Sequence, residues 1–313
     1  MSVSVAVLDD YQRVAEGLAP WSSLGSGAVV TFFHEPARDH RELVARLRPF
    51  EVLVLMRERT RLDAALIEQL PNLRLIVSPG KTNAAIDYEA AKRAGVDIVG
   101  TETIPHATPE LTWALILAFA RNLVPQVNEV RAGGWQVGLG MELSGKTLGI
   151  LGLGKVGARV ARYGQAFGMR VLAWSENLTR ETAAGYDVEW VERDELFRRA
   201  DVLSIHMVLS ARSRGLVADR ELRLMKPSAF IVNTSRGPIV SERALIAALQ
   251  EHRIAGAALD VFDQEPLPPE HPFRRLDNVL ATPHIGYVGQ ANYRHIYGQC
   301  VESLRAWLCR RAG

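Results

Sequence analysis

Cysteine is nearly absent from this 313-residue chain, which contains only Cys300 and Cys309. Both fall in one predicted helix, where a rise of about 1.5 Å per residue separates them by roughly 13 Å, too far for a disulfide. No group of histidine and cysteine residues has metal-ligand spacing, so we predict no metal site. These features are typical of a protein from a reducing compartment, and we expect a cytoplasmic location.

Long hydrophobic runs and an excess of charge of one sign are also missing. The most apolar long stretch, residues 111–124, is interrupted by Arg121 and Asn122 and is too short to span a bilayer. The N-terminus has no positive region followed by a long apolar core, so we expect no signal peptide. Lys and Arg total 37 against 35 Asp and Glu, without a basic block. We therefore expect neither a membrane nor a nucleic-acid partner.

The chain instead alternates short apolar runs with helical patterns, which predicts parallel sheets covered by helices on both faces. The predicted strands are residues 3–8, 29–33, 52–55, 75–77, 148–151, 171–174, 202–205, 230–232, 257–259 and 279–281. We expect an α/β protein with two doubly wound parallel-sheet domains. We expect residues 1–100 plus 288–313 to form a flavodoxin-like domain and residues 101–287 to form a Rossmann domain. The final helix returns to the first domain.

One predicted helix, residues 108–131, is apolar nearly all round. Thr108 suits its N-cap and Pro109 its first position. A helix without a polar face is buried or faces another subunit. We therefore expect a homodimer.

A glycine-rich turn follows the strand at residues 148–151. Gly152, Gly154 and Gly157 have the G-x-G-x-x-G spacing, with Lys155 and Val156 between the last two. The glycines permit a tight turn, close approach of the backbone to a pyrophosphate, and close packing of helix on strand. The following helix directs its positive end toward the phosphates. This turn predicts a dinucleotide site.

Ionisable residues follow three later strands. Arg236 comes after residues 230–232, Glu265 after residues 257–259 and His284 after residues 279–281. Ligands bind doubly wound sheets at the carboxyl ends of the strands. Hydride exchange between a nicotinamide and a carbonyl needs a group that trades a proton with the substrate oxygen, and histidine suits this role. A carboxylate beside it favours the protonated ring, and a guanidinium fixes a substrate carboxylate.

Together these segments resemble the D-isomer-specific 2-hydroxyacid dehydrogenases, the family of D-3-phosphoglycerate dehydrogenase, glyoxylate/hydroxypyruvate reductase and formate dehydrogenase. The order and spacing of the motifs match over essentially the whole chain. The matching segments are residues 152–157, Asn233-Thr234-Ser235-Arg236-Gly237, Leu259-Asp260-Val261-Phe262 with Glu265-Pro266, and Thr282-Pro283-His284-Ile285-Gly286.

The resemblance implies roles for residues in these matching segments. It implies Arg236 for substrate binding, Glu265 paired with His284, and His284 as acid/base. It places Thr234, Arg236, Asp260, His284 and Gly286 at the nicotinamide end of the cofactor.

The same resemblance implies substrate-binding residues in the first domain. Pro79, Gly80 and Lys81 would bind the substrate carboxylate through backbone amides. Arg57 or Arg59 would reach the substrate from the loop after residues 52–55, or these arginines are solvated loop charges. His206, at the end of another strand, is expected to be structural.

One departure leaves the cofactor open. The family often has Asp at the end of the strand after the glycine turn, where it binds the adenosine ribose. Here Ser175 and Glu176 occupy this place. Either Glu176 supplies the carboxylate and NAD is used, or Ser175, Asn177, Thr179 and Arg180 receive the 2′-phosphate of NADP. We favour NAD without excluding NADP.

We therefore predict an NAD(P)-dependent oxidoreductase that interconverts a small 2-oxo acid and a D-2-hydroxy acid. The alternative is a dinucleotide-sensing interaction protein, like the corepressors built on this fold. Oxidation of phosphoglycerate itself is a further possibility within the enzyme class. Because the chain stops soon after Cys309, we expect the C-terminal regulatory domain of some such enzymes to be absent.

Overall fold

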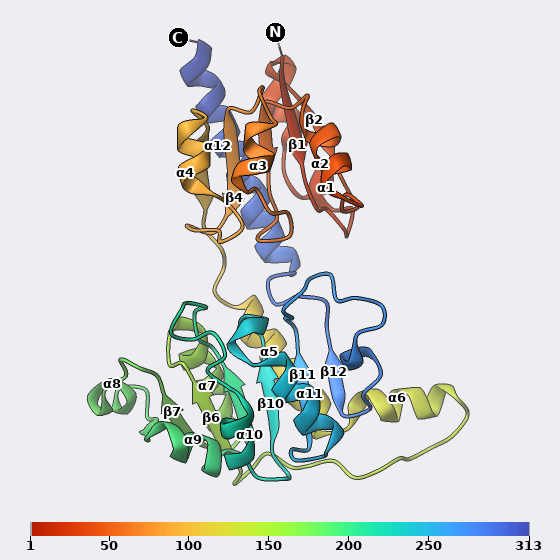
Figure 1. Cartoon of the computed structure of the whole chain (residues 1–313), viewed down its shortest axis with the longest axis vertical. Coiled ribbons are helices and arrows are strands. Elements are labelled where there is room, and N and C mark those ends of the chain that lie inside the picture. Colours follow the sequence, from red (N-terminus) through yellow and green to blue (C-terminus); the bar gives the residue numbers. More distant parts are fainter. Residues whose placement is uncertain (1, 313) are drawn as a thin grey trace. The chain divides into compact units, whose positions relative to one another are not determined.

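The computed structural model describes residues 2–312, and the chain divides into two compact units (Figure 1). The first unit combines Met1–Ile104 with Val288–Gly313, and the second is Pro105–Tyr287. Each unit contains one parallel sheet with helices on both faces. Among the described residues, no helix has both the length and the apolar character needed to cross a membrane.

The first unit has a five-stranded sheet in the order β2-β1-β3-β4-β5, which is the flavodoxin-like order. Its strands are β1 (Val3–Val7), β2 (Ala28–Phe32), β3 (Val52–Val54), β4 (Leu75–Pro79) and β5 (Asp97–Thr101). Its helices are α1 (Ala15–Leu18), η1 (Trp21–Gly27), α2 (His40–Leu47), α3 (Ala64–Glu68), α4 (Tyr88–Arg93) and α12 (Gln290–Ala312).

Alternate side chains of the first sheet enter two different helix layers. Ala6, Leu53 and Ile76 belong to the buried cluster that includes residues of α2, α3 and α4. Their neighbours Val54 and Val77 point to the opposite face, where α12 packs against β4 and β5. Both faces are covered, so the strands are apolar at nearly every position.

The second unit has a seven-stranded sheet in the order β12-β11-β10-β9-β6-β7-β8. Its strands are β6 (Thr147–Leu151), β7 (Arg170–Trp174), β8 (Glu189–Trp190), β9 (Val202–Ile205), β10 (Phe230–Asn233), β11 (Gly256–Leu259) and β12 (Val279–Ala281). Successive strands are added on one side of β6 up to β8 and then on its other side from β9. This reversal is the topological switch point, where doubly wound sheets bind their ligands.

The helices of the second unit form one layer on each face of this sheet. They are α5 (Ala107–Ala120), α6 (Leu123–Arg131), α7 (Lys155–Ala166), α8 (Arg180–Ala184), α9 (Arg193–Arg199), α10 (Asp219–Leu224), η2 (Gly237–Ile239), α11 (Glu242–Gln250) and η3 (Pro272–Arg274). Trp113 of α5 and Val160 of α7 share one buried cluster, and Phe197 of α9 and Leu245 of α11 share the other. The two-domain doubly wound fold predicted from the sequence is confirmed.

Strand β5 was not predicted, and it changes the first boundary. Only Ile98 and Val99 give it an apolar pattern, because Asp97 and Gly100 flank them on a half-exposed edge strand. Its backbone pairs with β4 as far as Thr101. The first unit therefore continues to Ile104, past the boundary predicted at residue 100.

The single helix predicted for residues 108–131 is two helices. Asn122 adopts the left-handed conformation, with φ at 52°, between α5 and α6. Asparagine accepts this conformation more readily than most residues. The break separates α5, with six buried residues, from α6, which has none. Only α5 packs on the sheet, and α6 projects from the unit in Figure 1.

Candidate functional site

The glycine turn predicted to bind a dinucleotide joins β6 to α7 at the switch point of the second sheet. Gly152 has a φ of +104°, and a Cβ there would lie 2.8 Å from the carbonyl carbon of His206. A Cβ on Gly157 would overlap the carbonyl oxygen of Gly152. Both positions therefore require glycine because backbone lies directly against them, as a tight strand–turn–helix junction demands.

Gly154 differs from the other two glycines, because a Cβ there would meet no atom within 4 Å. It is the N-cap of α7, and no side chain caps the helix. Gly154 and Lys155 are exposed, and Val156 is half-buried. The first amides of α7 thus lie beside open space at the positive end of a helix. This arrangement fits a pyrophosphate, so the chain's residues suit a dinucleotide.

The predicted adenosine end of the site lies after β7. Ser175 is half-buried and Glu176 is exposed. Two of the groups that the NADP alternative assigns to a 2′-phosphate have partners within the chain. The Thr179 hydroxyl accepts a hydrogen bond from the Thr182 amide at 3.2 Å, and the Arg180 guanidinium lies 4.6 Å from the centre of the Trp190 ring.

The loop after β10 is held by side chains on three sides. The Asn233 amide group donates to the Arg236 carbonyl at 3.0 Å and its oxygen accepts from the Ser235 amide at 3.0 Å. The Ser235 hydroxyl donates to the Ile205 carbonyl of β9 at 2.8 Å. Thr234 shares a 2.8 Å hydrogen bond with Thr112 of α5. Arg236 therefore extends from a rigid loop, and its Nη1 donates to the Ser235 carbonyl at 2.7 Å.

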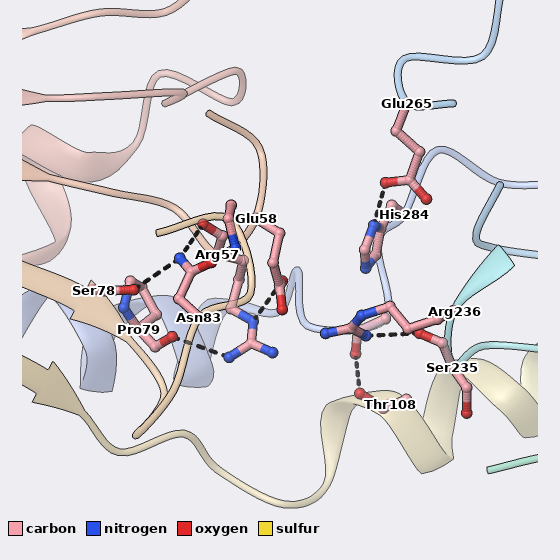
Figure 2. A network of polar contacts seen from close by, with 12 residues as sticks. Arg57, Glu58, Ser78, Pro79, Asn83, Thr108, Ser235, Arg236, Glu265 and His284 are labelled. Atoms are coloured by element: carbon pink, nitrogen blue, oxygen red, sulfur yellow. Dashed lines mark hydrogen bonds and ion pairs between the residues drawn. The ribbon is translucent and has the colours of Figure 1, made fainter. Parts of the chain in front are cut away.

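His284 and Glu265 are in direct contact, as the sequence predicted. Nδ1 of His284 lies 2.5 Å from Oε2 of Glu265 (Figure 2). The other carboxylate oxygen accepts a hydrogen bond from the Phe262 amide at 2.9 Å. An acceptor at Nδ1 assigns a proton to that nitrogen and leaves Nε2 as the atom that can exchange a proton with a ligand. The His284 side chain keeps 20% exposure, so Nε2 is not sealed in the core.

The segment that carries His284 is fixed by Asp260, which is fully buried at the end of β11. One carboxylate oxygen accepts from the Thr282 hydroxyl at 2.6 Å and the Ile285 amide at 2.8 Å, and the other accepts from the Gly286 amide at 2.8 Å. Burial raises the pKa of Asp260, and these donors oppose the rise. His284 itself has a φ of 52°, a strained conformation that the surrounding bonds maintain.

The backbone of His206 lies against Gly152 of the glycine turn. Burial lowers the pKa of His206 to about 3, so its ring is neutral at physiological pH. Its Nε2 lies 2.8 Å from the Ser204 hydroxyl of β9. His206 is therefore unsuited to supply a proton near neutral pH. Among the described residues, no group of three or more His, Cys, Asp or Glu is placed to hold a metal ion.

In the first unit, Arg57 belongs to the same loop cluster as Pro79, Gly80 and Lys81. Its Nη1 donates to the Pro79 carbonyl at 3.0 Å, as Figure 2 shows. Asn83 holds the two loops together, because its amide group donates to the Arg57 carbonyl at 2.8 Å and to the Ser78 hydroxyl at 3.0 Å. The structure thus brings Arg57 next to the segment predicted to bind a substrate carboxylate, and Lys81 is exposed there.

Arg59 lies in a different cluster. Its guanidinium stacks over the Tyr11 ring at 4.4 Å and donates to the Asp9 carbonyl at 2.6 Å and the Tyr293 hydroxyl at 3.4 Å. Thr60 donates to the Asp9 carboxylate at 2.7 Å. Burial raises the pKa of Asp9. Sequence reasoning missed this cluster, although Asp9-Asp10-Tyr11 directly after a strand is the kind of signal that placed Arg236 and His284.

Comparison with known proteins points to one family. The family model described as D-isomer specific 2-hydroxyacid dehydrogenase, NAD binding domain, matches residues 113–286. The chain is 44% identical over 234 residues to glyoxylate reductase of Aeropyrum pernix, covering 72% of this chain and 70% of that protein.

Two further relatives carry related names. D-3-phosphoglycerate dehydrogenase of Methanocaldococcus jannaschii is 38% identical over 249 residues, which cover 78% of this chain and 47% of that protein. The solved structure of a phosphoglycerate oxidoreductase from Vibrio cholerae superimposes with a TM-score of 0.93 at 40% identity, covering 97% of this chain and 98% of that one.

We expect Asp260→Asn to lower the free energy of unfolding by about 1–3 kcal/mol, because an amide replaces an acceptor that serves two backbone amides and a hydroxyl. Urea unfolding measures this change. The matched control is Asp263→Asn, at an exposed position of the same loop, whose effect should stay within about 0.5 kcal/mol. Equal effects of the two substitutions would contradict the role given to Asp260.

Proposed function

Because the chain belongs to the D-isomer-specific 2-hydroxyacid dehydrogenase family, we propose that His284 is the acid/base of a hydride transfer between NAD(P)H and a small 2-oxo acid. The enzyme class follows from the family: it is an NAD(P)-dependent D-2-hydroxyacid dehydrogenase. The corepressor-like alternative has no support, since the relatives named above are reductases, dehydrogenases and an oxidoreductase.

The contact between His284 and Glu265 carries the proposal. When bound, the nicotinamide cofactor supplies the hydride. His284 then gives the Nε2 proton to the carbonyl oxygen of the substrate as that carbon is reduced, and Glu265 stabilises the charged ring before the transfer. Arg236 binds the substrate carboxylate and polarises the carbonyl. In the oxidation of a 2-hydroxy acid, neutral His284 removes the hydroxyl proton.

For the cofactor, we propose that Gly152, Gly154 and Gly157 with Lys155 and Val156 hold the pyrophosphate. Glu176 and Ser175 receive the adenosine ribose, which favours NAD over NADP. Thr234, Asp260 and Gly286 line the nicotinamide end, Asp260 chiefly by holding the segment that contains His284.

The test is an assay of a panel of 2-oxo acids with NADH and NADPH. We expect turnover with at least one small acid and a lower Michaelis constant for NADH. His284→Ala should lower turnover by about 10²–10⁴-fold, because it removes the general acid, while NADH binding measured by fluorescence stays near the wild-type level. Unchanged turnover in His284→Ala would refute the assignment. Tight NADH binding without turnover of any acid would favour a sensor.

We propose different roles for the two arginines of the first unit. Arg57, beside Pro79, Gly80 and Lys81, binds the anionic substrate together with the amides of that loop. Arg59 is a structural residue, because Tyr11, Asp9 and Tyr293 already surround its guanidinium.

Single substitutions separate these roles. We expect Arg57→Ala to raise KM for the 2-oxo acid about tenfold or more with the melting temperature unchanged, since one charge-assisted hydrogen bond contributes about 1.5–3 kcal/mol. Arg59→Ala should instead lower the melting temperature, because it leaves the buried Asp9 without its cation. Steady-state kinetics and thermal unfolding of both variants decide the matter, and a reversed pattern would exchange the two assignments.

We further propose that the enzyme is a cytoplasmic homodimer formed through α6 and the loop after it. Large apolar side chains are exposed there, where a monomer would leave them in water. They are Leu123, Val124, Val127, Val130, Trp135, Val137 and Leu139. A reducing cytoplasm agrees with the exposed free thiol of Cys309.

Light scattering after size-exclusion chromatography tests the dimer. We expect a mass of about twice the 34.6 kDa of the chain for the wild type. The double variant Val127→Asp/Val130→Asp should be monomeric, because it places carboxylates in the buried interface. Val29→Asp, at an exposed apolar position of β2, is the control and should remain dimeric. A monomeric wild type would disprove the proposal.

A further inference from the structure

Gly237 immediately follows Arg236 and begins the short helix η2. It is buried, and its backbone does not adopt the left-handed conformation. No feature of its own backbone therefore requires glycine. The reason lies in a segment that follows another strand of the same sheet.

The peptide bond between Phe262 and Asp263 lies directly against the Cα atom of Gly237. A Cβ at Gly237 would be 2.6 Å from the Asp263 nitrogen and closer still to the carbonyl carbon and oxygen of Phe262. The atoms it would strike are backbone, so a side-chain rotation cannot relieve the overlap. One of the two loops would therefore have to move to relieve the overlap.

That backbone segment also holds Glu265. The Phe262 amide donates to one Glu265 carboxylate oxygen at 2.9 Å, and the other oxygen contacts His284 at 2.5 Å. We propose that Gly237 is a positioning residue, which sets the Phe262–Asp263 backbone at the distance that keeps Glu265 on Nδ1 of His284. This inference rests on the acid/base role proposed for His284 and Glu265.

The charged groups around His284 indicate what a displacement would do. Glu265 contacts the ring directly, and Asp260 interacts with it through its charge from the end of β11. Arg236 extends from the loop after β10 and is drawn below His284 in Figure 2, and the Tyr287 ring packs edge-on against the His284 ring with 5.5 Å between the ring centres. Only Glu265 depends on the Phe262 amide. Moving it away removes the negative charge nearest the ring and weakens the protonated form that reduction requires.

The experiment compares pH profiles of kcat/KM for reduction in the wild type, Glu265→Gln and Gly237→Ala. In each profile, kcat/KM falls at high pH, and we call this part of the curve the alkaline limb. We expect the alkaline limb to lie at lower pH in both variants than in the wild type. Turnover of Gly237→Ala should fall about 10–100-fold, as for a small misplacement of a catalytic group, while the NADH dissociation constant stays unchanged. In the double variant Gly237→Ala/Glu265→Gln, the alkaline limb should coincide with that of Glu265→Gln, because both changes remove the same interaction.

Gly298→Ala is the matched control. Gly298 lies within α12, and a Cβ there would meet nothing within 4 Å. This variant should keep the wild-type turnover and pH profile, which shows that a methyl group on a glycine is harmful only where backbone opposes it.

The outcomes distinguish the inference from the function on which it rests. An unmoved limb in Glu265→Gln would contradict the acid/base assignment. A moved limb in Glu265→Gln with an unmoved limb in Gly237→Ala would overturn the positioning role alone.

If Gly237→Ala does not fold, Asp263→Gly probes the same contact from the other side, because it loosens the opposing backbone. Asp263→Asn controls for the lost charge. If the alkaline limb moves to lower pH in Asp263→Gly than in Asp263→Asn, the inference is supported. If the limb lies at the same pH in the two variants, the inference is overturned.

Discussion

The geometry of the site in the second unit depends on the hydrogen bonds that the buried Asp260 carboxylate accepts. Asp260 directly follows β11, yet its partners are Thr282, Ile285 and Gly286 after β12. It therefore fixes the segment in which His284 has its left-handed backbone. Burying a carboxylate is costly unless several donors surround it, and here a hydroxyl and two amides do so. The histidine is positioned by another residue's hydrogen bonds, because its own backbone preference would not place it there.

The other site residues are positioned by the same means. Asn233 closes the loop that carries Arg236, and the Phe262 amide holds Glu265. In the first unit, Asn83 joins the Arg57 loop to Ser78. Asn233 ends its strand, and Phe262 and Asn83 lie in loops that follow parallel strands. At this edge of a sheet, loops from neighbouring strands meet and side chains distant in sequence become neighbours. Hydrogen bonds from groups without a chemical role, two asparagine side chains and one backbone amide, thus determine where the reactive residues lie.

The strand pattern and the glycine spacing were sufficient to predict the glycine turn and two parallel sheets, without strands β5 and β8. The order of Arg236, Glu265 and His284 was sufficient to indicate the family, and the contact between Glu265 and His284 followed. Strand β5 was not predicted because an edge strand with two apolar residues has no clear periodicity. The break between α5 and α6 at Asn122 was not predicted because the apolar pattern continues across it. A single left-handed residue leaves no periodic signal.

By itself, the sequence determined which residues follow which strand, because hydrophobic period and turn chemistry are local properties. It therefore specified the fold class, the nucleotide turn and the set of candidate catalytic groups. Beyond the Glu265–His284 pair, only the tertiary structure decided which side chains touch. Arg57 and Arg59 are equivalent in sequence, but one contacts Pro79 and the other lies over Tyr11. Gly237 likewise looks like an ordinary turn residue until the Phe262–Asp263 peptide is seen against it. Contacts between segments far apart in the chain depend on packing, and packing is a property of the whole folded unit.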